Sequence, residues 1–234
     1  ENLVRTTMEE NCTWAHHGQM WDTYNYRDKP LFGDIDDLET FVSVSQYMQA
    51  EGLRYAIECQ MRRYPKTAGI NIWQFDEPWP NVSCTNLVDY YGNPKFAYYF
   101  VRDAYKTFHI SMKHDRFVYD KDDTMHAEIH VLDSGEGACG RAEVGVRILD
   151  ADGKEVKTLH TSLQTRPDRT VKALSFDLPV KDFTGHFTVE CTLEIDGKHD
   201  KNVYLLFVKD EKHPHCAVLP VLAFMKQYFA EESF

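Results

Sequence analysis

The chain has 234 residues, of which 43% are hydrophobic, and its formal net charge is −11. A chain of this length can bury one large core or two smaller ones. The acidic balance argues against nucleic acid and anionic membrane surfaces as partners, because both would repel the chain. No apolar run reaches the roughly 18 residues that a spanning helix needs, so the sequence predicts no membrane segment.

The six cysteines are spread along the chain without the paired spacing of a zinc ribbon or a redox motif. A chain of this size can form a core without a disulfide framework. We therefore expect buried free thiols at Cys12, Cys59, Cys84, Cys139, Cys191 and Cys216.

The N-terminal part of the chain predicts a long loop followed by a helix. Residues 1–35 mix aromatic and polar side chains without a regular period, which is typical of a loop. Over residues 36–63, apolar side chains recur at three- and four-residue steps, which predicts an amphipathic helix. Tyr64-Pro65 ends this helix, because the residue before a proline avoids helical geometry.

The next segment has the order of elements found in βα units. Residues 68–75 (AGINIWQF) form a short apolar run between polar residues, which predicts a strand buried on both faces, as in a parallel sheet. A loop rich in proline, asparagine and glycine follows, and a second helix is predicted over residues 95–106.

Beyond Thr107 the pattern changes to short alternating runs, which predict strands of an antiparallel sandwich. Asp152-Gly153 and Asp196-Gly197 each fall between two runs and predict hairpin turns. Several short strands within about 100 residues indicate an immunoglobulin-like architecture. The predicted strands are 116–119, 124–132, 142–150, 171–177, 185–195 and 202–208.

Several segments carry a resemblance to a known family, because they occur in the right order and at the right spacing. They read WAHHG (14–18), QAEGLRYAIE (49–58), GINIWQFDEPWP (69–80), DYYGNPK (89–95) and AYYF (97–100). Together they resemble glycoside hydrolase family 2, and in particular its β-mannosidase-like branch. The likeness covers about residues 10–106, and Asp76 stands where that family more often has asparagine.

With this resemblance, the sequence predicts an α+β, multi-domain chain: a partial (β/α)8 barrel segment followed by an immunoglobulin-like antiparallel β-sandwich. We expect the barrel segment over residues 1–107, the sandwich over residues 108–209, and a tail or the start of a further element over residues 210–234. Residues 219–229 could form a short helix. A complete barrel needs on the order of 250 residues. The barrel segment must therefore pack against the sandwich, self-associate, or belong with a further segment.

The resemblance implies a retaining glycosidase that acts on a β-linked mannoside, galactoside or glucuronide without a metal or an organic cofactor. It places both catalytic glutamates upstream of residue 1, so the chain alone is expected to be inactive. Retaining enzymes need two carboxyl groups about 5–5.5 Å apart. Asp76 and Glu77 are neighbours whose side chains point apart, and Glu51 and Glu58 are separated by about 10.5 Å along a helix. Neither pair therefore fits the spacing of a catalytic pair.

Trp73, Asp76 and Glu77 are the candidate sugar-binding residues. Trp73 would end the eighth barrel strand, at the face where barrel enzymes hold substrates, and its indole offers a flat apolar surface to a sugar. A tryptophan of the core is the alternative. Asp76 and Glu77 could accept hydrogen bonds from sugar hydroxyls or cap the turn before Pro78. The resemblance also implies a cis peptide bond between Trp73 and Gln74.

Other conspicuous residues have structural interpretations. His16 and His17 are expected to be solvated or to pack, with contact to the substrate as the alternative. Trp79 is expected to pack beneath its loop, with a place in a sugar subsite as the alternative, and Glu51 is expected to pair with Arg54. Residues 89–92 are expected to form a turn in which the glycine has an unusual backbone angle.

The alternative function is a non-catalytic carbohydrate-binding or interaction module, which a solvent-exposed row of aromatic side chains on the sandwich would support. The alternation of the strands predicts instead that most of these side chains face inward, namely Phe117, Tyr119, Phe176, Phe183, Phe187, Tyr204 and Phe207.

Overall fold

The computed structural model describes residues 23–80, 85–134, 140–166 and 168–232. The contacts divide the chain into two compact units. One comprises the described residues within 1–55, 71–102 and 217–234, and the other those within 56–70 and 103–216. The expected domain boundaries at residues 107 and 209 stay predictions.

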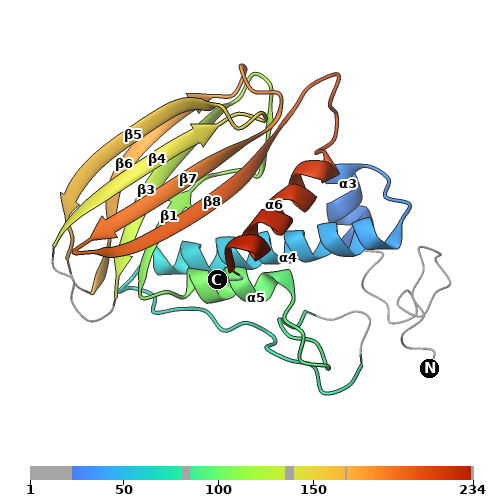
Figure 1. The fold of residues 1–234 in the computed structure, drawn as a ribbon, viewed down its shortest axis with the longest axis horizontal. Coiled ribbons are helices and arrows are strands. Elements are labelled where there is room, and N and C mark those ends of the chain that lie inside the picture. Colours follow the sequence, from blue (N-terminus) through green and yellow to red (C-terminus); the bar gives the residue numbers. More distant parts are fainter. Residues whose placement is uncertain (1–22, 81–84, 135–139, 167, 233–234) are drawn as a thin grey trace. The chain divides into compact units, whose positions relative to one another are not determined.

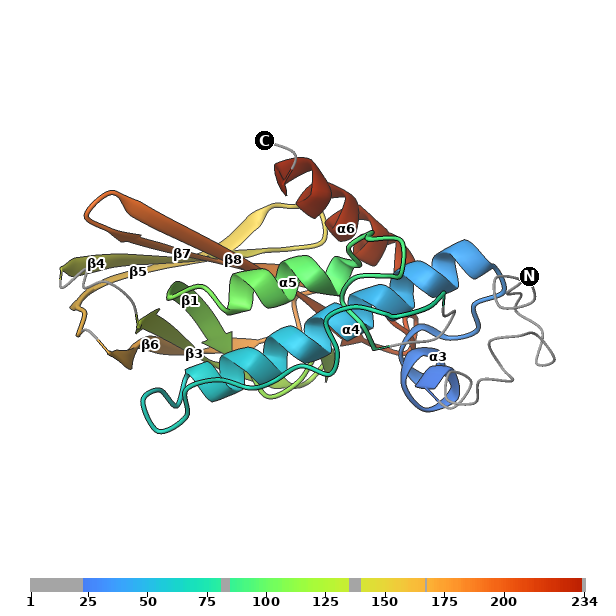
Figure 2. The same cartoon turned by 90° about the horizontal axis from the view of Figure 1, so that it is seen from below.

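The second unit contains two β-sheets that share one core (Figures 1 and 2). The 3-stranded sheet has the order β1-β3-β6, and the 5-stranded sheet has the order β2-β8-β7-β4-β5. Neighbouring strands are antiparallel, apart from the parallel pair of β2 and β8. The strands are β1 (Phe108–Lys113), β2 (Val118–Asp120), β3 (Thr124–Asp133), β4 (Arg141–Leu149), β5 (Glu155–Gln164), β6 (Arg169–Pro179), β7 (Gly185–Ile195) and β8 (Lys198–Lys209).

The predicted strands and both hairpins of this unit are confirmed. Asp152-Gly153 connects β4 to β5, and Asp196-Gly197 connects β7 to β8, where Ile195 pairs with Lys198. Gly153 and Gly197 have φ angles of 76° and 77°, the left-handed conformation that such turns require. The sequence patterns missed β1 and β5.

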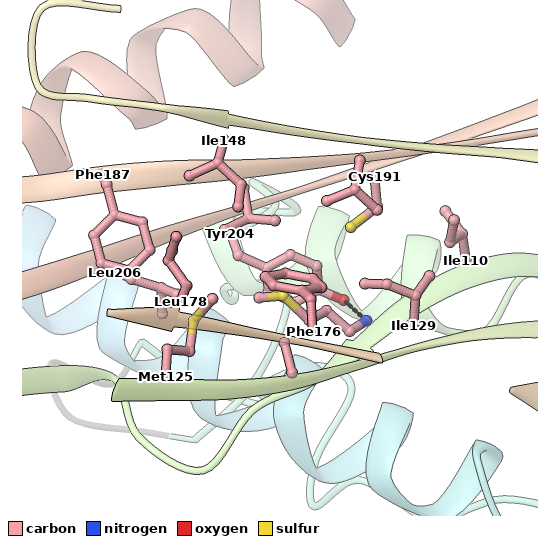
Figure 3. Close-up of a cluster of buried hydrophobic side chains, with 14 of the residues drawn as sticks. Ile110, Met125, Ile129, Ile148, Phe176, Leu178, Phe187, Cys191, Tyr204 and Leu206 are labelled. Atoms are coloured by element: carbon pink, nitrogen blue, oxygen red, sulfur yellow. Dashed lines mark hydrogen bonds between the residues drawn. The ribbon is translucent and has the colours of Figure 1, made fainter. Parts of the chain in front are cut away.

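The core of the second unit lies between the two sheets (Figure 3). Alternate side chains point inward, because successive residues of a strand face opposite sides. The free thiols of Cys191 and Cys216 are buried and that of Cys59 is half-buried; the other cysteines lie outside the described residues. The expectation that most sandwich aromatic side chains face inward is confirmed: Phe117 is half-buried, and the buried ones are Tyr119, Phe176, Phe183, Phe187, Tyr204 and Phe207.

The first unit is helical. The predicted helices are confirmed as α4 (Leu38–Met61), which continues into the second unit, and α5 (Phe96–Ala104); the tail forms α6 (Val218–Glu232). Aromatic rings hold them together: the ring centroids of Phe96 and Tyr228 are 5.4 Å apart, and those of Tyr47 and Phe224 are 6.0 Å apart. Across the described residues, none of the helices has both the length and the apolar character needed to cross a bilayer.

Two sequence predictions need correction. Part of the predicted N-terminal loop is helical, in η2 (Tyr24–Asp28) and α3 (Lys29–Phe32), while His16 and His17 lie outside the described residues. The strand predicted over residues 68–75 is wrong, because this segment has no regular structure and residues 68–71 are exposed. A strand buried on both faces needs a partner on each side, and no described strand pairs with this segment. The barrel segment as a whole stays a prediction.

Candidate functional site

The segment that carries Trp73, Asp76 and Glu77 comprises the described residues 71–80 and 85–95. Glutamine side chains of α4 bind it through hydrogen bonds. The Gln49 amide donates to the carbonyl oxygens of Thr85, at 2.9 Å, and Asn86, at 3.2 Å. One turn earlier, the Gln46 side-chain oxygen accepts a hydrogen bond from the backbone N–H of Phe96, at 3.2 Å. The amphipathic helix therefore presents two glutamines that position residues 85–86 and the start of α5.

Backbone hydrogen bonds then join residues 74–75 of the segment to residues 87–88. The N–H of Leu87 lies 3.2 Å from the carbonyl oxygen of Gln74 and 3.0 Å from that of Phe75, and the N–H of Val88 donates to Phe75 at 2.8 Å. The N–H of Lys95 donates to the Leu87 carbonyl oxygen at 2.8 Å. Residues 74–75 are thus held by residues that α4 and α5 position.

Asn86 is the buried polar side chain at the centre of this arrangement, with 3% of its surface exposed. Its amide nitrogen donates to the Val88 carbonyl oxygen at 2.7 Å, and its amide oxygen accepts from the Lys95 ammonium group. Gln49 and Lys95 fall within the motifs that carry the resemblance, but no sequence pattern assigned a role to either residue or to Asn86.

We expect Asn86→Ala to lower the free energy of unfolding by about 1–3 kcal/mol, because it removes the hydrogen bonds of a buried side chain to Val88 and to the charged Lys95. Chemical denaturation followed by circular dichroism measures this change. Asn71→Ala is the matched control, since Asn71 is exposed in the same unit, and should change stability by less than about 0.5 kcal/mol. Equal effects of the two substitutions would show that Asn86 does not organise the segment.

Trp73 is 81% exposed, so it is not a residue of the core of this chain. The peptide bond between Trp73 and Gln74 is cis, as the sequence resemblance implied. Asp76 is exposed as well, whereas Glu77 is buried and its Oε2 accepts a hydrogen bond from the Gln74 amide at 3.2 Å. The structure therefore leaves an indole and one carboxylate accessible, while the second carboxylate contacts Gln74.

Of the other two sequence predictions for this segment, one is wrong and one is confirmed. The prediction that Trp79 packs beneath the loop is wrong, because its side chain is 59% exposed. The turn at residues 89–92 is confirmed, with a φ angle of 85° at Gly92. Asp89 Oδ1 accepts from the backbone N–H groups of Tyr91 and Asn93, at 2.9 and 2.8 Å. Hydrogen bonds from the side chain and the backbone of Asn93 lower the pKa of Asp89 below its usual value.

Glu51 forms the expected ion pair with Arg54, at 2.6 Å. The guanidinium group also lies 4.6 Å from the centre of the Phe100 ring, and Glu51 Oε1 accepts from the Tyr47 hydroxyl at 3.0 Å. Glu51 therefore has a structural role in the first unit.

Within the described part of the chain, no group of three or more histidine, cysteine, aspartate or glutamate side chains is arranged to hold a metal ion.

Comparisons with known proteins agree with the motifs. The chain is 26% identical over 163 residues to β-mannosidase B of Thermothelomyces thermophilus, and the match covers 62% of this chain and 19% of that protein. It is 35% identical over 68 residues to β-mannosidase B of Aspergillus niger, covering 28% of this chain and 8% of that protein. No family model matches. The chain thus spans less than a fifth of the length of these relatives.

The fold is similar to that of the exo-chitosanase CsxA of Amycolatopsis orientalis, with a TM-score of 0.66 and 21% sequence identity. This likeness covers 80% of this chain and 21% of the exo-chitosanase. The sequence relatives and this fold fit a protein like those of glycoside hydrolase family 2. Within that class, the sequence similarity is to fungal proteins named β-mannosidase B.

Proposed function

We propose that this chain is part of a retaining glycosidase that acts on β-linked sugars and that it supplies sugar-pocket residues but not the catalytic carboxylates. The observation that carries this proposal is the exposed indole of Trp73, three residues before the exposed Asp76, in a segment hydrogen-bonded to α4. Support comes from the sequence relatives, which are named β-mannosidases. A β-mannoside is therefore the first candidate substrate, ahead of a galactoside or a glucuronide.

Each proposed contact has a chemical reason. An indole ring presents a broad apolar face, which suits the C–H face of a pyranose, and its N–H donates to hydroxyl groups. The carboxylate of Asp76 accepts hydrogen bonds from sugar hydroxyls, since an ionised carboxylate is an acceptor only. Glu77 is buried, and its carboxylate accepts a hydrogen bond from the Gln74 amide, so its proposed part is to hold Gln74, the residue after Trp73.

The acidic residues of the candidate site do not form an evident catalytic pair. A retaining glycosidase uses one carboxylate as nucleophile and a second as acid and base, about 5–5.5 Å apart. Glu51 is bound to Arg54, and Glu77 is buried against Gln74 while Asp76 is exposed. We therefore assign the catalytic pair to another part of the glycosidase. The chemistry of two carboxylates requires no metal and no organic cofactor.

The alternative function, a non-catalytic carbohydrate-binding module on the sandwich, has less support. Such a module would present aromatic side chains to solvent. Among the described strands, the aromatic side chains expected to face inward are buried or half-buried.

The substitution Trp73→Ala tests the proposed sugar contact. We expect it to weaken the binding of p-nitrophenyl β-mannoside by about tenfold, because that factor corresponds to the loss of one aromatic stacking contact. Nuclear magnetic resonance titration of the chain with the glycoside measures the affinity. Tyr26→Ala is the matched control, since Tyr26 is 84% exposed in the same unit but lies outside the segment. Unchanged affinity in the Trp73 variant would contradict the proposed contact.

A further inference from the structure

A buried polar cluster completes one edge of the sandwich. Among the described strands, β1 pairs only with β3, so the backbone groups of its other edge need different partners. Alternate side chains of β8 supply them: Asp200 accepts from the N–H of Ile110 at 2.9 Å, and Asn202 donates to its carbonyl oxygen at 3.0 Å. The Tyr204 hydroxyl accepts from the N–H of Met112 at 2.8 Å, drawn as a dashed line in Figure 3.

Glu58, near the end of α4, joins the same cluster. Its Oε1 accepts from the Asn202 amide at 2.7 Å, and its Oε2 accepts from the Tyr204 hydroxyl at 2.8 Å. The Arg62 guanidinium lies 3.5 Å from Oε2 and also donates to the Met112 carbonyl oxygen at 3.4 Å. Glu58, Asn202 and Tyr204 are all buried. The end of α4 is therefore bonded to both β1 and β8 within the second unit.

His109 of β1 connects the two carboxylates of the cluster. Its Nδ1 lies 2.9 Å from Asp200 Oδ2, and its Nε2 lies 3.3 Å from Glu58 Oε1 and 3.4 Å from the Asn202 amide nitrogen. Ionised carboxylates only accept hydrogen bonds, so the ring donates to both carboxylates only when both of its nitrogens carry a proton. A neutral ring would set one nitrogen lone pair against a carboxylate oxygen. His109, Glu58 and Asp200 are each less than a tenth exposed.

The surrounding charges favour the ring with both nitrogens protonated. Burial by itself lowers the pKa of His109, but its hydrogen bonds and charge interactions with Asp200 and Glu58 outweigh burial and raise the pKa to about 9. Burial raises the pKa of Asp200, yet the hydrogen bond from His109, the positive charge of the ring and that of Lys106 hold this pKa below its usual value. Lys106 lies 3.1 Å from Asp200 and 3.4 Å from Asp103.

We propose that Glu58, His109 and Asp200 form an alkali-sensitive latch, in which the His109 imidazolium holds the end of α4 and the edge of β1 on β8, and loss of its proton releases both. The direction follows from the linkage of protonation to folding. The pKa of His109 is higher in the folded chain than the ordinary value near 6.5. Its contribution to stability is therefore complete below about pH 6.5 and is lost as the pH rises through about 9.

Nuclear magnetic resonance of the full 234-residue chain tests the latch. We expect both ring nitrogens of His109 to be protonated at neutral pH and to titrate with a midpoint near pH 9. The amide proton of Ile110, which donates to Asp200, should shift with the same midpoint. Glu58→Gln removes one of the two negative charges and should lower the midpoint by about one pH unit.

His126 provides the control within the same spectra. It is an exposed histidine of the same unit with its own aspartate partner, Asp177, at 2.6 Å, and its titration should leave the Ile110 amide unchanged. A neutral His109 ring at neutral pH, or an Ile110 amide that does not follow the ring, would overturn the proposal. These two readouts use the unsubstituted chain, so they remain decisive if the Glu58 variant does not fold.

Discussion

Replacing Phe187 with alanine is expected to lower the free energy of unfolding by about 3–5 kcal/mol. Phe187 lies on β7 and is fully buried between the two sheets. The centre of its ring lies 4.7 Å from that of Phe183 and 6.5 Å from that of Tyr119. Truncation removes these contacts and leaves a cavity that strands held in two sheets cannot close. Urea denaturation followed by circular dichroism measures the loss.

Val156→Ala is the control for this substitution. Val156 lies on β5 at the edge of the 5-stranded sheet and is 50% exposed, so its truncation should cost less than about 0.5 kcal/mol. A Phe187 variant no less stable than the Val156 variant would contradict the position of the core between the sheets.

Asp200→Ala is expected to have an effect of similar size, about 3–5 kcal/mol, because removing one partner of a buried ion pair leaves the other charge uncompensated. The substitution deprives the His109 ring, the Ile110 amide and the Lys106 ammonium group of their common acceptor. The same denaturation measurement at neutral pH reports the change.

Asp177→Ala is the matched control for Asp200→Ala, because Asp177 also pairs with a histidine, His126, but its side chain is 70% exposed. Exposed ion pairs contribute at most about 1 kcal/mol. If the two aspartate variants were equally stable, the buried cluster would not hold the edge of β1.

The sequence predicts the sandwich where local pattern and burial coincide. Alternation of apolar and polar residues marks β3, β4 and β7, and the Asp-Gly pairs mark both hairpins. It misses β5, whose side chains are all exposed or half-buried and therefore show no alternation. It misses β1 because two of its polar residues, His109 and Ser111, are buried. Burial of a polar side chain depends on partners from distant elements, and a local pattern does not contain them.

Contacts between residues far apart in the sequence also explain why the arrangement of the candidate site was not predicted. The motif around Trp73 is recognisable in the sequence, but the strand expected there requires neighbouring strands, and the described chain has none beside it. The contacts that position the segment join residues 36 and 37 positions apart, through Gln49. In the buried cluster, Glu58 and Asn202 are 144 positions apart. Amide and carboxylate contacts over such separations leave no periodic signal.

Hydrolysis of a panel of p-nitrophenyl β-glycosides, by this chain and by the glycosidase proposed to contain it, shows whether the catalytic pair lies outside this chain. We expect the glycosidase to cleave one of the β-linked sugars, with the mannoside as the first candidate, and this chain alone to cleave none. Cleavage by this chain alone at an enzyme-like rate would overturn the proposed function, because the catalytic carboxylates would then lie within residues 1–234.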